Sequence, residues 1–451
     1  MYKLIKNPTI INEDQVFVSD VLIKNDTIIK IGKNITGFPE NCEIIDATGL
    51  FLFPGIIDMH VHFREPGLTH KGDIYSESRA AAAGGVTSFC DMPNTIPQTA
   101  NLNEFHKKIN IAKNQSLINY GFYIGANRKN IDYLCENDLS EVAGIKVFMG
   151  LTKEDANFIE NAQLRKLFYS GSVPILLHCE EEKTILENLE KYKQKYGDDI
   201  PMKCHPRIRS QEACAQSIKK AITLSKTARN FLTGVIHICH VSTALEVDVI
   251  NDAKIHASDI TSETSANYLW FSEKDYAQYG TKIKCNPAIK TEKDRLVLLV
   301  EALNKGKIEL IASDHAPHTI EEKQKNYANA PSGIPSIQHS FQMMLDLQQQ
   351  GYFNIYKIAQ FMSHAPAKIF FIEKRGFIRE GFFADLVLVD FNQTTTVSKE
   401  NILYKCGWSP LEGYTFNSKI IKTFVNGEIV YQNGKINDNV KAAKALEFSR
   451  E

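Results

Sequence analysis

Several features that would place the chain in a special class are missing from its sequence. No apolar run reaches the roughly 20 residues that a membrane-spanning helix needs, and the polar start, Met1 to Asn12, lacks the core of a signal peptide. The 52 basic and 53 acidic residues leave a net charge of -1, which indicates neither nucleic acid nor an anionic membrane surface as a partner. The nine cysteines are scattered without Cys-x-x-Cys spacing, so we expect reduced thiols in a cytoplasmic protein.

The composition that remains is that of a globular protein, with 451 residues of which 43% are hydrophobic and 23% charged. Its middle part alternates apolar strands with helix-like segments such as 75–83, 102–113, 211–227 and 292–305. The expected strands are 51–62, 86–93, 120–126, 144–150, 174–180, 234–242, 260–266 and 308–315. Eight such units predict an α/β fold, a (β/α)8 TIM-type barrel with its chemistry at the carboxyl ends of the strands. The alternative is an open doubly wound sheet, but no Gly-x-Gly-x-x-Gly follows the first strand.

Both ends of the chain consist of short β-like pieces. The pairs Asn25-Asp26 and Asn426-Gly427 predict hairpin turns between them. We therefore expect a small β-sandwich-like domain built from residues 1–53 and 371–451, the latter including a tail, around a barrel of residues 54–370.

The stretch from Pro54 to Gly67 is the most informative part of the chain. Its apolar first half predicts a buried strand, and His60 and His62 follow at alternate positions. Alternate residues of a strand point to the same side, so the two imidazoles form a candidate pair of metal ligands. Two packed core histidines are the plainer interpretation, but the polar residues gather only at the strand's end, where Arg64 follows directly.

Polar residues at the ends of four later strands complete the candidate site. Lys146 lies inside an apolar strand, where a charge needs a partner or a function. His178 ends another strand, and His240 follows His237 by three positions, so only one of those two is expected to face the barrel; we choose His240. Asp314 ends the last strand, with His315 beside it as a competing ligand.

Together these residues could serve two metal ions if Lys146 bridges them. His60, His62 and Asp314 would hold one ion, and His178 and His240 the other. Nitrogen and oxygen ligands suit zinc, with cobalt and manganese as alternatives. A water between two such ions becomes hydroxide near neutral pH, which favours hydrolysis of an amide-like bond.

The chain also resembles the dihydroorotases of the amidohydrolase superfamily over most of its length. The resemblance is carried by the segments 58–67, 91–95 (Asp-Met-Pro-Asn-Thr), 144–150 (Gly-Ile-Lys-Val-Phe-Met-Gly), 177–180, 240–242, 285–290 and 313–318 (Ser-Asp-His-Ala-Pro-His), extended by 331–333 and 338–340. The run after Gly150 departs from the family's Ser-Ser-Thr-Gly-Asn-like pattern, but no ligand position is lost.

This resemblance implies the reversible cyclisation of N-carbamoyl-L-aspartate to L-dihydroorotate in pyrimidine biosynthesis. It implies two Zn²⁺ per subunit, bridged by a carbamylated Lys146 and a hydroxide, with Asp314 as proton shuttle. It further implies that Arg64, Asn94 and His318 bind the substrate's carboxylate and that Asn286 contacts the ring. Allantoinases and dihydropyrimidinases are the catalytic alternatives, and a metal-free scaffold is the non-catalytic one. We expect a small-molecule substrate, no nucleic-acid or membrane partner, and leave a homodimer open.

Overall fold

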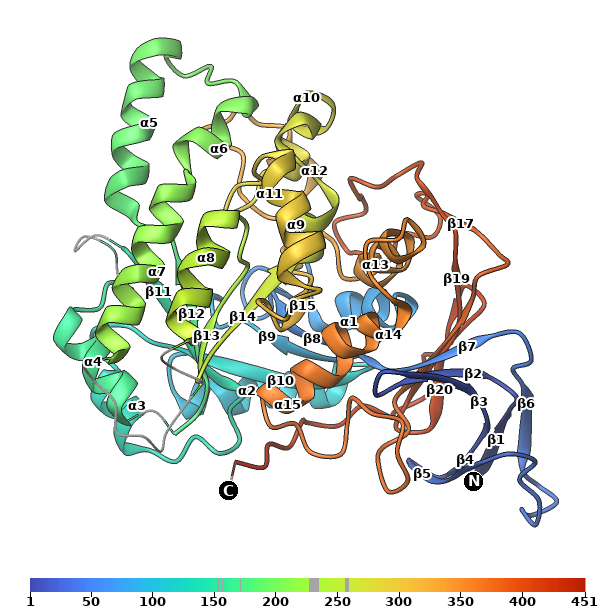
Figure 1. Cartoon of the computed structure of the whole chain (residues 1–451). Coiled ribbons are helices and arrows are strands. Elements are labelled where there is room, and N and C mark those ends of the chain that lie inside the picture. Colours follow the sequence, from blue (N-terminus) through green and yellow to red (C-terminus); the bar gives the residue numbers. More distant parts are fainter. Residues whose placement is uncertain (152–154, 156, 171, 227–234, 256–258, 451) are drawn as a thin grey trace.

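The computed structural model describes residues 1–450 except 152–154, 156, 171, 227–234 and 256–258. Eight parallel strands form the central sheet in the order β15-β14-β13-β12-β11-β10-β9-β8. Their bounds are β8 Ile56–Val61, β9 Val86–Asp91, β10 Asn119–Gly125, β11 Gly144–Met149, β12 Ile175–Cys179, β13 Ile236–Ile238, β14 Ile260–Ser265 and β15 Leu310–Ala312. A bridge between Val61 and His315 brings the first and last strands together, which confirms the predicted barrel (Figure 1).

Helices surround the barrel on its outer side. The longer ones are α1 Ile74–Ala83, α2 Leu102–Gln115, α4 Asn161–Ser170, α5 Glu182–Tyr196, α7 Gln211–Lys226, α8 Ala244–Lys254 and α13 Ser340–Gln349. Shorter ones include α3 Ile131–Glu136, α6 His205–Ile208, α9 Ala266–Trp270, α10 Tyr276–Tyr279, α11 Glu292–Leu296, α12 Ile320–Lys323, α14 Ile355–Ala359 and α15 Ala365–Ile369. The predicted helices 75–83, 102–113 and 211–227 correspond to α1, α2 and α7, although residue 227 lies outside the described residues. The predicted helix 292–305 is α11 followed by a π-helical stretch, Val297–Ala302.

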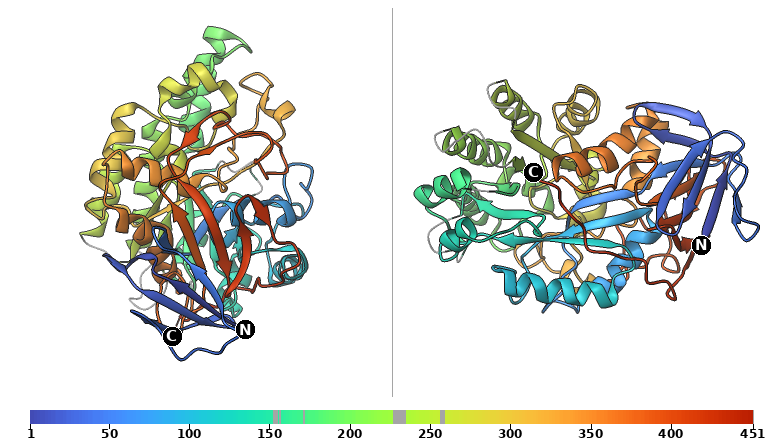
Figure 2. Two further views of the ribbon diagram at one scale, coloured as in Figure 1. Left: turned by 90° about the vertical axis from the view of Figure 1, so that its right-hand side faces the viewer. Right: turned by 90° about the horizontal axis from the view of Figure 1, so that it is seen from below.

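The two chain ends form a second layer beside the barrel. A four-stranded sheet joins β1 Tyr2–Lys6, β4 Asp20–Lys24, β5 Thr27–Gly32 and β6 Glu43–Asp46. A seven-stranded sheet joins β2 Thr9–Asn12, β3 Gln15–Val18 and β7 Phe51–Pro54 to β16 Leu386–Asp390, β19 Lys419–Val425, β20 Glu428–Gln432 and β21 Lys435–Ile436. Early and late segments therefore lie side by side (Figure 2). Both predicted hairpins are present, because β4 pairs with β5 and β19 with β20.

The central strand β16 of the seven-stranded sheet is buried on both faces. Leu386 and Leu388 of β16 pack in the cluster between the two sheets, whereas Val387 and Val389 join the barrel's main core. This alternation is what a strand covered on both sides requires. The β-layer is thus fixed to the barrel by packing, in the sandwich-like arrangement that the sequence predicts. The exact boundaries at residues 53 and 370 stay a prediction.

The expected strand 51–62 is in fact two strands with different partners. β7 belongs to the outer sheet and β8 to the barrel, and Gly55 lies between them. A Cβ atom at Gly55 would lie 2.2 Å from Thr87 Oγ1, so the chain crosses between the layers where only glycine fits. The apolar residues of this segment did not indicate that the chain changes from one sheet to another here.

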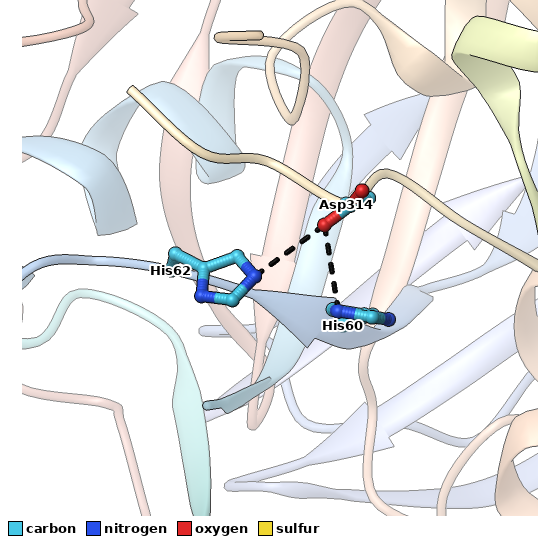
Figure 3. A group of neighbouring side chains, drawn as sticks. All are labelled: His60, His62 and Asp314. Atoms are coloured by element: carbon cyan, nitrogen blue, oxygen red, sulfur yellow. Dashed lines mark ion pairs between the residues drawn. The ribbon is translucent and has the colours of Figure 1, made fainter. Parts of the chain in front are cut away.

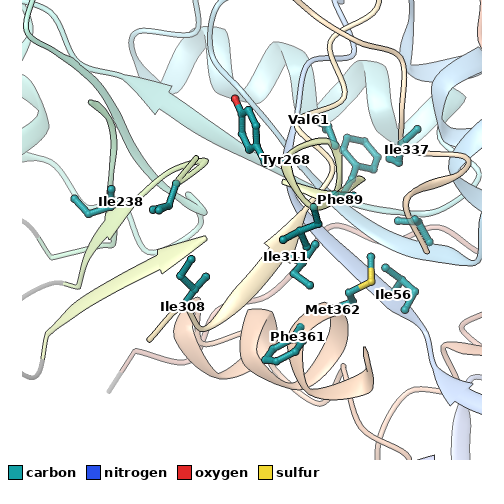
Figure 4. Packing of buried hydrophobic residues seen from close by; sticks show 14 of the residues in the cluster. Ile56, Val61, Phe89, Ile238, Tyr268, Ile308, Ile311, Ile337, Phe361 and Met362 are labelled. Carbon is teal, nitrogen blue, oxygen red and sulfur yellow. The ribbon is translucent and has the colours of Figure 1, made fainter. Parts of the chain in front are cut away.

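The interior of the barrel is apolar at its lower end and polar at its mouth. Ile56, Val61, Phe89, Ile238 and Ile311 pack outward against the helices (Figure 4). Other side chains fill the lower end of the barrel, namely Ile57, Met59, Tyr123, Leu176, Leu310 and Phe370. Leu446 of the C-terminal tail packs against them. Among the described residues no helix is long and apolar enough to cross a membrane.

Candidate metal centre and substrate pocket

A cavity of about 400 Å³ opens at the carboxyl ends of the barrel strands. Nine predicted site residues line it, namely His60, His62, Arg64, Asn94, Lys146, His178, His240, Asn286 and Asp314. The tenth, His318, lies behind Arg64, with its Nε2 atom 3.0 Å from Arg64 Nη2. The fold therefore brings together residues that lie up to 258 positions apart in the sequence, from 60 to 318.

One side of the cavity gathers His60, His62 and Asp314 (Figure 3). Nε2 of each histidine lies 3.4 Å from the same oxygen, Oδ1 of Asp314. His60 comes from β8, His62 follows that strand, and Asp314 follows β15. Asp314 has a backbone φ of 48°, in the left-handed region that non-glycine residues rarely adopt, and such local strain is typical of functional sites.

A second pair of imidazoles, His178 and His240, lies beside this group, and the ring centres of His60 and His240 are 5.4 Å apart. His178 Nδ1 and His240 Nε2 are 2.8 Å apart, and the rings are nearly perpendicular. His240 Nδ1 is buried and has no hydrogen-bond partner within the described part of the chain. Burial lowers the pKa of both imidazoles, with nearby positive charge contributing in the same direction, so both rings are neutral and able to act as metal ligands.

Lys146 lies between these two groups on β11 and is 1% exposed. Its Nζ atom donates to Cys239 Sγ over 3.1 Å and lies 5.6 Å from the centre of the Phe148 ring. Across the described residues no carboxylate forms an ion pair with it, so the interpretation as a lysine neutralised by an acid has no support there. A buried ammonium with only a thiol as neighbour is costly, which points to a further partner or a modification.

Oxygen acceptors lie behind three of the four histidines, on the nitrogen that faces away from the cluster. His60 Nδ1 contacts Glu263 Oε1, His62 Nδ1 lies 2.8 Å from Asn94 Oδ1, and His178 Nε2 lies 3.1 Å from Glu180 Oε2. A metal-binding histidine commonly donates its second nitrogen to such an acceptor, which fixes ring and tautomer.

Glu263 is the centre of the most deeply buried of these contacts. It is fully buried, and its second oxygen lies 3.2 Å from His237 Nε2. Burial raises the pKa of Glu263, but the charge of His60 and the hydrogen bonds from both histidines outweigh burial and hold it below its ordinary range.

The expectation that only one of His237 and His240 faces the barrel is wrong, because β13 ends at Ile238 and the chain turns at His240, whose φ is 41°.

His315, the competing ligand, is turned away from the cavity. Its Nε2 atom lies 2.9 Å from Glu77 Oε2, and its Nδ1 atom accepts the backbone N–H of Ser336 over 3.0 Å. Both nitrogens are thus occupied in the protein core. This leaves Asp314 as the candidate ligand after β15.

The substrate side of the cavity carries positive charge. Arg64 donates from Nε to the carbonyl oxygen of Pro317 over 3.0 Å, which leaves its outer nitrogens toward the cavity and His318. Asn286 Oδ1 accepts the Ser332 hydroxyl over 2.9 Å. Ser332 and Gly333 line the cavity, so the segment that follows β15 reaches it. In the atypical run after Gly150, residues 152–154 and 156 lie outside the described residues.

Sequence reasoning missed Glu180, Glu263 and Lys71. Glu263 carried a usable signal, because it is an acid inside an otherwise uncharged strand, Ile260–Ser265. Glu180 follows His178 closely but looked like the start of a polar helix. Lys71 gave no signal, since it lies in a polar loop whose contacts are set by the fold.

The donor set fits metal ions. Around His60, His62 and Asp314, two imidazole nitrogens converge on one carboxylate oxygen at 3.4 Å, an arrangement that suits ligands around a cation. An orphaned imidazole nitrogen and an unpaired buried lysine at the same site are further signs of a missing charged partner.

Comparison with known proteins agrees with this arrangement. Residues 51–430 match the Amidohydrolase family. A dihydroorotase from Caldicellulosiruptor saccharolyticus is 35% identical, covering 96% of this chain and 99% of the relative. Dihydroorotases from Bacillus cytotoxicus (32%, covering 96% of this chain and 99% of the relative) and Methanothermobacter thermautotrophicus (30%, covering 87% of each) are also similar.

Among solved structures, the L-hydantoinase (dihydropyrimidinase) of Arthrobacter aurescens superimposes with a TM-score of 0.92 at 24% identity, covering 99% of both chains. At that identity the likeness shows the barrel and its β-layer alone. The family match covers most of the chain and includes every candidate metal ligand. The chain therefore belongs to the amidohydrolase family.

Proposed function

We propose that this chain is a dihydroorotase, which closes N-carbamoyl-L-aspartate to L-dihydroorotate and water and also catalyses the reverse reaction. The observation that carries the proposal is an anion site, Arg64 with His318, at the edge of a cavity whose other wall is a cluster of metal-type ligands. Such a pair suits a ring that bears a carboxylate. The similarity to dihydroorotases over nearly the whole chain supports the same reaction.

Arg64 is the main contact for the substrate's carboxylate. Arg64 is 7% exposed, and within the described residues it forms no ion pair with an acid. A planar guanidinium binds a carboxylate through two parallel hydrogen bonds, which fixes the orientation of the ring as well as its affinity. Asn94 and His318 add donors on the same side, and Asn286, held by Ser332, contacts the amide edge of the ring.

We further propose that the site holds two zinc ions, one at His60, His62 and Asp314 and the other at His178 and His240. When bound, such ions act as Lewis acids on the ring carbonyl and lower the pKa of water. Lys146 carries a carbamate in this proposal. The ammonium first loses a proton, and the neutral amine then adds to carbon dioxide and loses a second proton, which replaces the cation with an anionic group that has two oxygen ligands.

Asp314 moves the proton. Burial raises its pKa, but the neighbouring imidazoles of His60 and His62 outweigh burial and keep it below its ordinary value, so the carboxylate is ionised and able to accept. During hydrolysis it takes the proton of the attacking water and gives it to the ring nitrogen as that nitrogen leaves. During cyclisation the same group takes the proton from the carbamoyl nitrogen. Asn94 holds the ring of His62 and thereby the position of Asp314.

We also propose a cytoplasmic location, which agrees with dissolved metabolites as substrates and with nine free cysteines. The proposed reaction gives the protein a place in pyrimidine synthesis. Assembly as a homodimer stays a prediction.

The test is turnover of L-dihydroorotate by the purified, zinc-loaded protein, with allantoin and dihydrouracil in parallel. We expect hydrolysis of dihydroorotate alone, and a loss of about 10²-fold or more in Lys146→Ala and Asp314→Ala. Turnover of allantoin or dihydrouracil instead would contradict the carboxylate site. A metal-loaded protein that is inactive on all three would support a non-catalytic role.

A further inference from the structure

We infer that Lys71 is a positioning residue that fixes the tautomer of His318, so that the imidazole donates a hydrogen bond to the substrate's carboxylate. This inference rests on the proposed function and names a residue that determines its substrate class. Lys71 lies in the loop after Arg64 and does not line the cavity. It acts through His318 and not by touching the substrate.

One nitrogen of His318 is held by Lys71. The Lys71 Nζ atom lies 3.1 Å from His318 Nδ1 and 3.0 Å from Glu322 Oε1. A lysine ammonium has three donors and no acceptor, so the nitrogen that it faces must present its lone pair. Nδ1 of His318 therefore carries no proton.

The other nitrogen of His318 faces a backbone oxygen. Nε2 lies 3.0 Å from the carbonyl oxygen of Ser332, which can only accept. Nε2 must therefore carry the proton of the neutral ring. Burial, together with the charges of Arg64 and Lys71, holds the pKa of His318 well below its ordinary value, so the ring is neutral. Two independent contacts thus select the same tautomer.

This tautomer leaves two donors facing each other. Arg64 Nη2 lies 3.0 Å from the same Nε2 atom, and neither group can accept from the other. The Nε2–H already donates to the Ser332 carbonyl, and a second acceptor placed beside Arg64 Nη2 would share this proton and also accept from Arg64. A carboxylate oxygen of the substrate satisfies both, because it accepts several hydrogen bonds and neutralises the charge of Arg64.

Glu322 explains why Lys71 is needed. Glu322 Oε2 lies 3.6 Å from His318 Nδ1. Without the ammonium between them, His318 would place its proton on Nδ1 and donate it to Glu322. Nε2 would then accept from Arg64, and the two groups would satisfy each other. The pocket would then lose the donor on His318, and His318 would compete with the substrate for the donor on Arg64.

The experiment compares Lys71→Met, Lys71→Arg and a control, Lys405→Met, in the zinc-loaded enzyme with L-dihydroorotate. Lys405 pairs with Asp73 outside the cavity, so its replacement removes the same charge without touching His318. We expect Lys71→Met to raise KM about tenfold to a hundredfold with kcat changed far less, as for the loss of a hydrogen bond to a charged group. Lys71→Arg keeps a donor and should stay near the wild type, as should Lys405→Met.

The wild-type protein provides a measurement that does not depend on any variant. Nitrogen-15 spectra of histidine-labelled enzyme report the tautomer of each ring, and His318→Gln identifies the signal. A proton on Nε2 of His318 supports the inference, and a proton on Nδ1 overturns it. An unchanged KM in Lys71→Met, or a loss in kcat alone, also overturns it. A wild-type enzyme without dihydroorotase activity would instead refute the proposed function, and the tautomer could still be determined.

Discussion

Replacing Glu263 with glutamine tests whether the carboxylate behind His60 controls metal affinity. In the native protein two imidazoles converge on this fully buried side chain, His60 through Nδ1 and His237 through Nε2. Glutamine keeps the shape but offers one oxygen and one NH2 group, so one imidazole loses its acceptor and meets a donor. A hydrogen bond to a charged group contributes about 1.5–3 kcal/mol, which corresponds to about tenfold to a hundredfold in affinity. Losses of that size are typical for the partners of metal-binding histidines.

The assay is equilibrium competition for zinc between the metal-free protein and a chelator. We expect weaker zinc binding at the proposed site of His60, His62 and Asp314, with little change at the proposed site of His178 and His240. Glu77→Gln is the matched control, because Glu77 is equally buried and also holds an imidazole, that of His315, which faces away from the cavity. Unchanged zinc affinity in Glu263→Gln, or an equal loss in Glu77→Gln, would refute the reasoning.

Two further predictions concern stability. Asp385 pairs with Arg375, both 3% exposed, and also accepts from Asn119 Nδ2 and the backbone of Asn426. Asp385→Ala should therefore lower the free energy of unfolding by about 3–5 kcal/mol. A decrease of less than about 1 kcal/mol in urea denaturation would contradict this. Burial lowers the pKa of Lys323 from 10.5 to about 7. The unfolded chain therefore binds more protons between these values, and the penalty of burying this lysine is full below about pH 7 and disappears as pH rises toward 10.5. Thermal melts across that range should show a difference between wild type and Lys323→Met that varies with pH, and a constant difference would argue against it.

The polar residues in apolar strands made much of the site predictable. Lys146 and Asp314 are costly to bury, and His178 and His240 end strands whose remainder is apolar. In a parallel barrel the carboxyl ends of all strands meet at one face, so separate sequence positions were expected to converge. The structure brings these side chains to one cavity, although their roles stay proposals.

The contacts behind the ligands could not be predicted in the same way. His60 and Glu263 are 203 positions apart, and their pairing depends on the tilt and register of strands on opposite parts of the barrel. The turn at His240 and the change of sheet at Gly55 interrupt the strand alternation on which sequence arguments rest. Lys71 lies in a loop, where local pattern gives no direction for a side chain.

The lower half of the barrel explains why these charges are tolerated at its mouth. Tyr123, Leu176 and Phe370 fill the interior beneath the ligands, and Leu446 of the C-terminal tail closes it from below, where Tyr120 pairs with residues 444 and 446. Among the described residues, mostly apolar side chains thus fill the barrel beneath the ligands. In such a dry interior a misplaced charge is expensive, so each polar group needs a fixed partner. That requirement accounts for the acceptors behind His60, His62 and His178. By the same requirement, the donors of Lys146 and Arg64, which have no acid as partner among the described residues, indicate where partners are expected: the metal bridge at Lys146 and the substrate's carboxylate at Arg64.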